Sequence, residues 1–450
     1  MATKASNNLP RTRMSAFSMF QLIEAKKQGQ ELSVEAIKWM IAEFTAGRLP
    51  DYQMAAMLMA ITLKGMNAKE TAAVTDAMVF SGRALDFKDR RVVDKHSTGG
   101  IGDKASFVLA PIAACLGVMV PMIAGRGLGH TGGTVDKIEA IPGFRTDLSL
   151  DVFQQQLREK GLVLIGQTPE IAPADKKLYA LRDVTATIAC IPLITASIMS
   201  KKLAEGAEGM VFDLKYGSGA FMRTRADART LAKSLIATAK RFKRKAVVLV
   251  TDMNQPLGNT VGHTLELQEC VATLQGKGPR DLTELSIELA AHMAVLAGTQ
   301  KSLNKARQAA RESVENGTAF EKFCDLIRWQ GGDDSYLRRP EKLPVAKETT
   351  VVAAPKSGTV ASFANDQFGY LLIELGGGRK TKDDKLDLAV GITMHAKLGT
   401  KVKKGAPLFT IHHHEAQAPL ARELAARFVR HHLSIKASAR APKLIAEVIR

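Results

Sequence analysis

Two glycine-rich turns in the first third of the chain contain the residue types that bind phosphate. They cover residues 94–106 and 125–134, and each follows a short apolar run typical of a β-strand. Glycines leave backbone N–H groups uncovered and permit positive φ, so such turns can surround an anion. Lys95 adds a full positive charge, and hydroxyl donors come from Ser97, Thr98, Ser106 and Thr134. A phosphate needs this combination of one cation and several short-range donors, so we predict a phosphate site.

The second turn also permits another interpretation. Residues 127–132 form a G-x-G-x-x-G pattern, and Asp147 follows about 20 residues later, where a dinucleotide site places its ribose carboxylate. A nicotinamide- or flavin-dependent oxidoreductase is therefore an alternative. We favour it less, because that fingerprint belongs in the first βα unit and a richer phosphate loop precedes it here. The sequence has no G-x-x-x-x-G-K-[ST] motif, so a P-loop NTPase is not supported.

Both turns closely resemble motifs of the thymidine and pyrimidine-nucleoside phosphorylase family. The resemblance extends to later segments in the family's order. The matching segments are Lys95-His96-Ser97-Thr98-Gly99-Gly100, Gly125-Arg126-Gly127-Leu128-Gly129-His130-Thr131-Gly132-Gly133-Thr134-Val135-Asp136-Lys137-Ile138-Glu139, Gly166-Gln167-Thr168, Ala172-Pro173-Ala174-Asp175-Lys176-Lys177, Tyr179-Ala180-Leu181-Arg182-Asp183-Val184-Thr185 and Ser197-Ile198-Met199-Ser200-Lys201-Lys202.

The resemblance, strongest to the thymidine phosphorylases of this family, implies a homodimeric cytoplasmic pentosyltransferase. It would convert thymidine or deoxyuridine and phosphate into the base and 2-deoxy-α-ribose 1-phosphate, with inorganic phosphate as co-substrate and no organic cofactor or metal. A broad enzyme that also accepts uridine is the alternative. The dimer would form through the helical domain.

The resemblance also assigns roles to residues around the base. It implies catalytic roles for His96, Arg182 and Lys201, with the pyrimidine bound by Arg182, Ser197 and Lys201 and with His96 near its O2. Such cations and donors would stabilise the negative charge that develops on the leaving base. From the residues alone, Ser197 and Lys201 share a helix face because they are four positions apart. Arg182 and Lys201 also suit surface cations on an apolar helix, and His96 suits a neutral imidazole packed against the turn.

Three positions depart from the family's pattern. Ala124 stands where a serine is usual, which removes one hydroxyl donor to phosphate. Lys104 stands where some bacterial members bind a cation through a threonine, so its ammonium would replace that ion, with Glu269 as a candidate partner. Met122 stands where broad-specificity members tend to carry lysine, which favours deoxyribosides.

Hydrophobic patterns predict the elements that position these residues. From residue 17 to about 78 the pattern is helical, with Ser33 and Asp51 as candidate caps and Asn67 with Glu70 as a capping box. Apolar strands then alternate with helices, which argues for a mostly parallel sheet covered by helices. The uncharged run 107–125 is cut by prolines and a glycine, so we predict a buried helix and strand rather than a membrane span.

The predicted fold is an α/β protein with a small all-helical domain, a larger mixed α/β domain and a β-rich, barrel-like C-terminal module, with a cleft between the two lobes. The expected boundaries are a disordered tail at 1–14, a helical domain at 15–84 and 174–206, a phosphate-binding α/β domain at 85–173 and 207–345, and the C-terminal module at 346–450. The return of the chain to the helical domain is implied by the resemblance. The basic stretch 422–450 suggests a solvated helical face and a tail, and residues 412–414 a surface histidine cluster.

Composition limits the remaining possibilities. The formal net charge of +18 would suit nucleic acid or membrane partners, but the basic residues are spread along the chain without a known nucleic-acid motif. We therefore expect neither partner. The four cysteines are scattered without a C-x-x-C pair, which fits reduced thiols in a cytosol. The polar, basic start has no apolar segment of the kind found in signal peptides.

Overall fold

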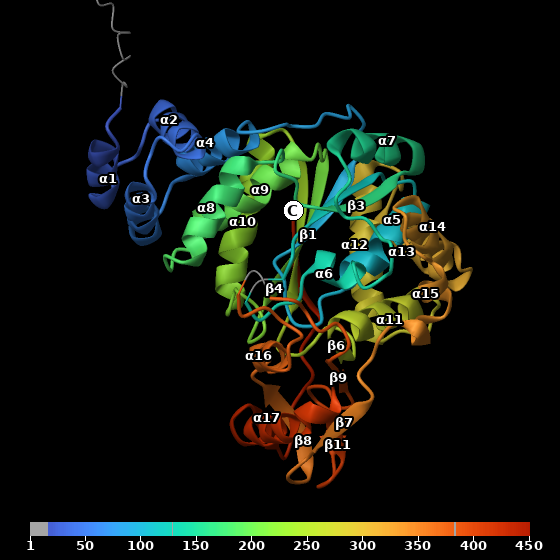
Figure 1. Ribbon diagram of the computed structural model, residues 1–450. Coiled ribbons are helices and arrows are strands. Elements are labelled where there is room, and N and C mark those ends of the chain that lie inside the picture. The colour runs from blue at the N-terminus through green and yellow to red at the C-terminus, as the bar shows by residue number, and fades with distance from the viewer. Residues whose placement is uncertain (1–16, 128, 382–383) are drawn as a thin grey trace, which may run out of the picture.

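The structure is a computed structural model that describes residues 17–127, 129–381 and 384–450. A helical lobe and a larger α/β lobe stand side by side, and a β-rich module lies beneath them in Figure 1. The predicted tail at 1–14 lies outside the described residues. The predicted combination of a helical domain, an α/β domain and a β-rich C-terminal region is confirmed.

The helical lobe combines four N-terminal helices with two later ones. Its helices are α1 (Met19–Lys27), α2 (Val34–Thr45), α3 (Asp51–Lys64), α4 (Ala68–Val79), α8 (Pro173–Asp183) and α9 (Ile191–Ala204). Ser33 accepts a hydrogen bond from the Ala36 amide at 3.1 Å, and Asn67 and Glu70 form the predicted capping box. Asp51 is the first helical residue rather than a cap, because Pro50 precedes it in extended conformation. A shared apolar core joins α2–α4 to α8 and to the start of α9.

The α/β lobe contains a mainly parallel sheet. Its strands are β1 (Val93–Ser97), β2 (Val120–Ala124), β3 (Leu162–Gly166), β4 (Gly209–Tyr216) and β5 (Lys245–Asp252). β1, β4 and β5 pair in parallel, as do β2 and β3, and a bridge between Val92 and Met119 links the two sets. Its helices are α5 (Ala105–Cys115), α6 (Thr134–Ile138), α7 (Leu150–Lys160), α10 (Arg225–Arg241), α11 (His263–Leu274), α12 (Arg280–Ala297), α13 (Leu303–Glu315), α14 (Thr318–Trp329) and α15 (Ser335–Arg338).

The two predicted phosphate turns leave the carboxyl ends of β1 and β2, where parallel sheets place their ligands. The first turn leads into α5 and the second into α6. The uncharged run forms α5 and then β2, both buried, as predicted. Within the described part of the chain, no helix is long and apolar enough to cross a membrane.

The C-terminal module is built from short antiparallel strands and two helices. Its elements are β7 (Glu348–Ala353), β8 (Gly358–Phe363), α16 (Asp366–Glu374), β9 (Gly391–Met394), β10 (Lys401–Val402), β11 (Pro407–His413), α17 (Ala418–His431) and β12 (Leu433–Lys436). They form two open sheets, in the orders β10-β8-β12 and β6-β9-β11-β7, rather than a closed barrel. The α/β lobe contributes β6 (Thr260–Val261) to the second sheet.

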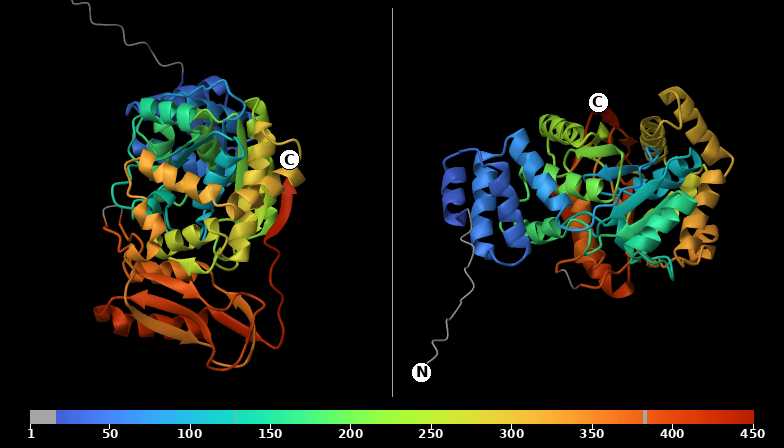
Figure 2. Two further views of the ribbon diagram at one scale, coloured as in Figure 1. Left: turned by 90° about the vertical axis from the view of Figure 1, so that its right-hand side faces the viewer. Right: turned by 90° about the horizontal axis from the view of Figure 1, so that it is seen from above.

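Two sequence interpretations in this module are wrong. The end of the chain is not a solvated tail, because β13 (Ile445–Ile449) returns to the α/β lobe and pairs antiparallel with β5 (Figure 2). The histidines at 412–414 are not a surface cluster either. His413 is buried and within hydrogen-bond distance of Thr350 Oγ1, while His414 on the next position is exposed. Alternation along β11 separates these side chains.

Candidate active site

The first glycine turn brings a cation and a hydroxyl together at the end of β1. Lys95 is only 4% exposed, and its Nζ lies 3.3 Å from the Oγ of Ser106 in the first turn of α5. Ser97 accepts a hydrogen bond from the Gly99 amide at 3.1 Å. The structure therefore groups three of the predicted phosphate ligands between β1 and α5.

The second turn lies beside the first. A side chain added at Gly99, whose φ is +81°, would come within 3.9 Å of Thr131 Oγ1 in the second turn. Thr134, another predicted ligand, is the half-buried first residue of α6. Ala124 is the last residue of β2 and is also half-buried. Both predicted positions are thus at the edge of the sheet where the turns meet.

Asp103 organises the first turn, although the sequence analysis did not identify it. Its carboxylate accepts a hydrogen bond from the Ser97 hydroxyl, and its backbone carbonyl accepts one from Lys137 Nζ at 2.8 Å. Burial alone would raise the pKa of Asp103, but Lys215 and Lys95 hold it below its usual range. The anionic Asp103 therefore fixes the hydroxyl of a predicted phosphate ligand.

His96 lies where the charges of both lobes converge. Burial, followed by the charges of Lys202, Lys201 and Lys95, lowers its pKa well below the usual value. The imidazole is therefore neutral at neutral pH, with one nitrogen able to donate and the other able to accept. Its ring contacts Phe212 edge to face, with 6.4 Å between the centroids. A neutral imidazole, one of the two roles considered from the sequence, suits hydrogen bonding to an uncharged base.

α9 presents the predicted base-binding pair. Lys201 Nζ lies 3.1 Å from the Ser197 Oγ, one turn earlier on the same helix face. The ammonium also contacts the carboxylate of Asp175 at the start of α8, which is 3% exposed while Lys201 is 21% exposed. Asp175 therefore orients Lys201. In the sequence, the one signal for this residue is its place in the segment 172–177, which resembles a family motif.

Arg182 is held differently from the prediction. Its guanidinium donates to the carbonyls of Ile188 at 2.9 Å, Leu193 at 3.2 Å and Thr187 at 3.3 Å, and the residue is 1% exposed. Burial lowers its pKa. The interpretation of Arg182 as a surface cation is wrong, because its side chain is buried and donates hydrogen bonds to carbonyls of the segment that connects α8 to α9 and of α9 itself.

Lys104 has the environment predicted for it. Its Nζ contacts Glu269 Oε2 at 2.5 Å, and it donates to the carbonyls of Leu257 at 3.0 Å and Thr260 at 2.7 Å. The Thr260 hydroxyl lies 3.2 Å away. The contact with Glu269 is therefore confirmed, and the ammonium is surrounded by oxygen atoms. No group of three or more His, Cys, Asp or Glu side chains suited to a metal occurs among the described residues.

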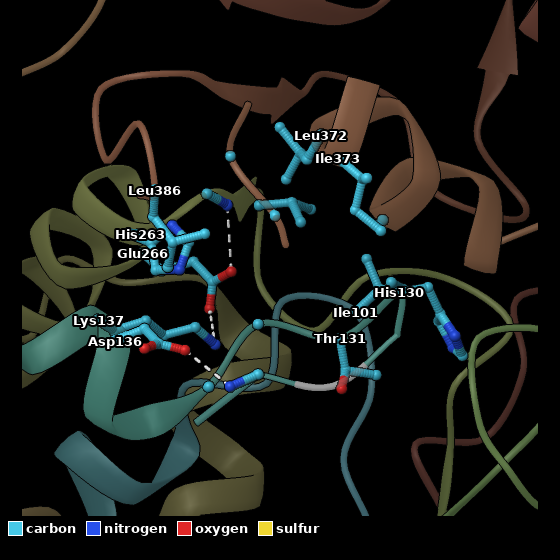
Figure 3. A pocket seen from close by; sticks show the side chains of 18 of the residues that line it. Ile101, His130, Thr131, Asp136, Lys137, His263, Glu266, Leu372, Ile373 and Leu386 are labelled. Atoms are coloured by element: carbon cyan, nitrogen blue, oxygen red, sulfur yellow. Dashed lines mark hydrogen bonds and ion pairs between the residues drawn. The ribbon is translucent and has the colours of Figure 1, made fainter. Parts of the chain in front are cut away.

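A pocket separates the second glycine turn from the C-terminal module (Figure 3). Lys137 and Glu266 face each other along it at 2.6 Å. Arg379 of the C-terminal module donates to both oxygens of Asp136 at 2.8 and 2.9 Å, and Asp136 accepts from the Gly127 amide at 2.7 Å. Among the described residues lining this pocket there is none of the predicted phosphate or base ligands. We interpret this pocket as part of the boundary between the second glycine turn and the C-terminal module, where the contacts of Arg379 with Asp136 support the turn.

The dinucleotide interpretation gains no support from this geometry. Asp147 is exposed and pairs with Arg145 at 3.0 Å. The helix that follows the G-x-G-x-x-G pattern, α6, has only five residues. The second turn is instead connected to the first one and to the C-terminal module.

Comparison with known proteins covers all three parts of the chain. Residues 20–82 match the helical bundle domain of a glycosyl transferase family, 89–320 its a/b domain, and 359–430 the pyrimidine nucleoside phosphorylase C-terminal domain. A pyrimidine-nucleoside phosphorylase of Staphylococcus haemolyticus is 45% identical over 433 residues, which are 96% of this chain and 99% of the relative.

The chain belongs to the pyrimidine-nucleoside phosphorylase family. A Staphylococcus aureus member of this family is 47% identical over 396 residues, covering 88% of this chain and 92% of its own. The crystal structure of anthranilate phosphoribosyltransferase from Thermus thermophilus shares the fold, with a TM-score of 0.56 and 18% identity over 69% of this chain and 99% of that one. The family resemblance read from the glycine turns is thus confirmed.

Proposed function

We propose that this protein catalyses the reversible phosphorolysis of pyrimidine nucleosides. A phosphate oxygen forms a bond to the sugar C1′ while the bond from C1′ to the base nitrogen breaks. The electron pair leaves with the base, which then takes up a proton. The observation that carries this proposal is the presence of two donor sets: Lys95 Nζ lies 3.3 Å from Ser106 Oγ, and Lys201 Nζ lies 3.1 Å from Ser197 Oγ.

The two halves of the site have separate tasks in this reaction. Lys95, Ser97, Ser106 and Thr134 hold the phosphate, and the buried lysine supplies a cation without bulk water to screen it. Lys201 and Ser197 donate to the base and stabilise its growing negative charge. His96, being neutral, donates a hydrogen bond to a carbonyl of the base. Inorganic phosphate is the co-substrate, and no organic cofactor or metal is required.

In this proposal Arg182 positions the helix that binds the base. Its three carbonyl bonds fix the connection that starts α9, and α9 carries Ser197 and Lys201. Its guanidinium has five N–H donors and uses three of them on these carbonyls, so two remain for a direct contact with the pyrimidine.

We further propose that thymidine and deoxyuridine are preferred over uridine. Met122 supports this preference, because it is 3% exposed in an apolar core and offers no charge or hydrogen bond to a ribose 2′-hydroxyl. A broad specificity that includes uridine is the alternative, and it agrees with the name that the two Staphylococcus relatives carry.

A phosphate-dependence assay tests both proposals. Initial rates of base release are measured by ultraviolet absorbance with thymidine, deoxyuridine and uridine, each with and without phosphate. We expect release only with phosphate and a higher kcat/KM for the two deoxyribosides. Equal release without phosphate would reject phosphorolysis, and equal kcat/KM for uridine would establish the broad alternative.

A homodimer through the helical lobe is also proposed. Tyr52, Met59 and Leu63 lie on one face of α3 and are 74%, 37% and 74% exposed, and Phe20 on the adjacent α1 is 72% exposed. These helices lie at the outer edge of the molecule (Figure 1). Large exposed apolar patches of this kind mark interfaces. Analytical ultracentrifugation should show a dimer that Leu63→Glu converts to monomer, whereas a monomeric parent protein would reject the proposal.

We place the enzyme in the cytoplasm. All four cysteines are unpaired, and three of them are buried, which suits a reducing compartment. Quantitative labelling of four thiols in protein denatured under alkylating conditions is the expected result.

A further inference from the structure

Three buried charged side chains lie directly behind the proposed site. Lys202 is 2% exposed, and Asp94 and Glu205 are both fully buried. The Lys202 Nζ is 2.5 Å from Asp94 Oδ2 and 3.0 Å from each oxygen of Glu205. It also donates to the carbonyl of Ile123 at 3.4 Å. A single ammonium is therefore bonded to β1, to the end of β2 and to α9.

The sequence neighbours of these partners are the proposed ligands. Asp94 directly precedes Lys95, and Ile123 directly precedes Ala124 and the second glycine turn. Lys202 directly follows Lys201. In the same helix, Leu193 and Ala196 belong to the core of the helical lobe, whereas Ile198 and Met199 belong to a core of the α/β lobe. Lys202 therefore stands where the phosphate half and the base half of the site are joined.

The cluster contains one ammonium and two carboxyl groups, so its net charge is zero if one carboxyl is protonated. Burial raises the pKa of Glu205 well above its usual range, and Asp94 adds to this effect against the opposing charge of Lys202. Lys202 and Asp94 form an internal ion pair, with 2.5 Å between Nζ and Oδ2. Asp94 Oδ1 has no hydrogen-bond partner among the described residues, so Lys202 is the main compensation for this carboxylate.

We propose that Lys202 is a positioning residue that fixes the phosphate-binding end of β1 at the correct distance from the base-binding face of α9. It is too buried to touch either substrate, so it acts through Lys95 and Lys201. This role rests on the proposed phosphorolysis. Because each half of the site has its own ligands, loss of Lys202 should disturb their relative placement more than the binding of either substrate.

The test compares full-length Lys202→Met with the parent protein. Methionine keeps most of the length and apolar volume of the side chain but removes the ammonium. We expect kcat to fall about 10- to 100-fold, since small misplacements of reacting groups have effects of this size. The KM values for phosphate and thymidine should each stay within about threefold, because uniform binding is retained.

Two further variants separate positioning from simple destabilisation. Lys26→Met removes another buried ammonium, one that pairs with Glu70 at 2.6 Å inside the helical lobe. It should lower the Tm comparably while kcat stays within about twofold, because the site is distant. Asp94→Asn combined with Lys202→Met removes both charges of the internal pair. It should recover Tm relative to Lys202→Met, but kcat should stay low.

The outcomes are distinct. A kcat loss in Lys26→Met equal to that in Lys202→Met, or recovery of kcat in the double variant, would show that Lys202 only stabilises the fold. A loss confined to KM would also overturn the positioning role. A parent protein that releases no base with any pyrimidine nucleoside and phosphate would instead reject the proposed function, and this role with it.

Discussion

The ammonium of Lys104 and the carboxylate of Glu269 form a buried ion pair, with 2.5 Å between Nζ and Oε2. Two backbone carbonyls and a hydroxyl complete the oxygen shell around the nitrogen. Such a shell is suited to a monovalent cation, and here the cation is covalently attached to the chain. We propose that this ammonium supports the adjoining first glycine turn in place of a dissociable ion.

Activity should consequently be independent of potassium. Replacing sodium by potassium at constant ionic strength should leave kcat/KM unchanged in the parent protein. Lys104→Ala should leave the oxygen shell open, and its Tm should rise with potassium. Lys104→Met, which fills the space with an apolar side chain, is the matched control and should show no such rise. Clear potassium activation of the parent protein would contradict this prediction.

Removal of Lys201 should affect the rate directly. We expect Lys201→Ala to lower kcat/KM about ten- to hundredfold, the range for a lost charged hydrogen bond of roughly 1.5–3 kcal/mol. The buried Asp175 would lose its partner, so the free energy of unfolding should fall too. Adding Asp175→Asn should restore stability in a denaturant titration but not the rate. Near-normal kcat/KM in Lys201→Ala would reject the assignment.

Arg182→Ala should unfold more easily than the parent protein. The substitution leaves the carbonyls of Thr187, Ile188 and Leu193 without their donor, which should cost at least about 2 kcal/mol of unfolding free energy. Activity should fall with it, because α9 loses its anchor. Urea denaturation measures the first effect. An unchanged midpoint would mean that these carbonyls find other donors.

His96 should stay neutral as the pH falls. Its pKa is lowered in the folded protein, while the unfolded chain takes up a proton near the ordinary value of about 6.5. The contribution of His96 to stability is therefore complete above that pH and is lost as the pH falls from there through the folded pKa. An NMR titration, with the signal assigned through His96→Gln, should give a pKa below 6.5. A value at or above 6.5 would place His96 in a more solvated or anionic setting.

Ala124→Ser should tighten phosphate binding. A hydroxyl at this half-buried position, beside the second turn, would add one charge-assisted hydrogen bond worth about 1 kcal/mol, which corresponds to about a fivefold lower phosphate KM. The thymidine KM should barely change, because the base contacts α9. Phosphate KM is measured at saturating thymidine. An unchanged or higher value would show that residue 124 does not face the anion.

Local patterns predicted the elements well where the cause of the structure is itself local. The Asn67 and Glu70 capping box and the helix and strand within 107–125 formed as expected, because caps and apolar runs act over a few residues. The predicted cap at Asp51 was wrong by one position, since Pro50 already supplies the extended residue.

Contacts between residues that are far apart in the chain could not be predicted from the sequence. Arg182 looks like an exposed cation in an amphipathic segment, and only the folded α8–α9 connection shows its carbonyl partners. Asp175 and Asp103 acquire their roles through contacts with side chains that the fold brings near them. Arg379 reaches Asp136 across 243 positions, a separation at which no local pattern exists.

The pairing of β13 with β5 has a consequence for how the protein is made. β5 pairs with β4 on one side and with β13, residues 445–449, on the other. During synthesis β4 is made before β5, whereas β13 is made much later, so the second edge of β5 is at first unpaired. Domains fold from the N-terminus as the chain grows, so this edge of the sheet stays open until residues 445–449 have been synthesised. An open edge of the sequence Lys245–Asp252, apolar over most of its length, is a template for intermolecular pairing. Nascent or truncated chains that lack residues 445–449 should therefore be the aggregation-prone forms of this protein, because β13 covers the edge of β5.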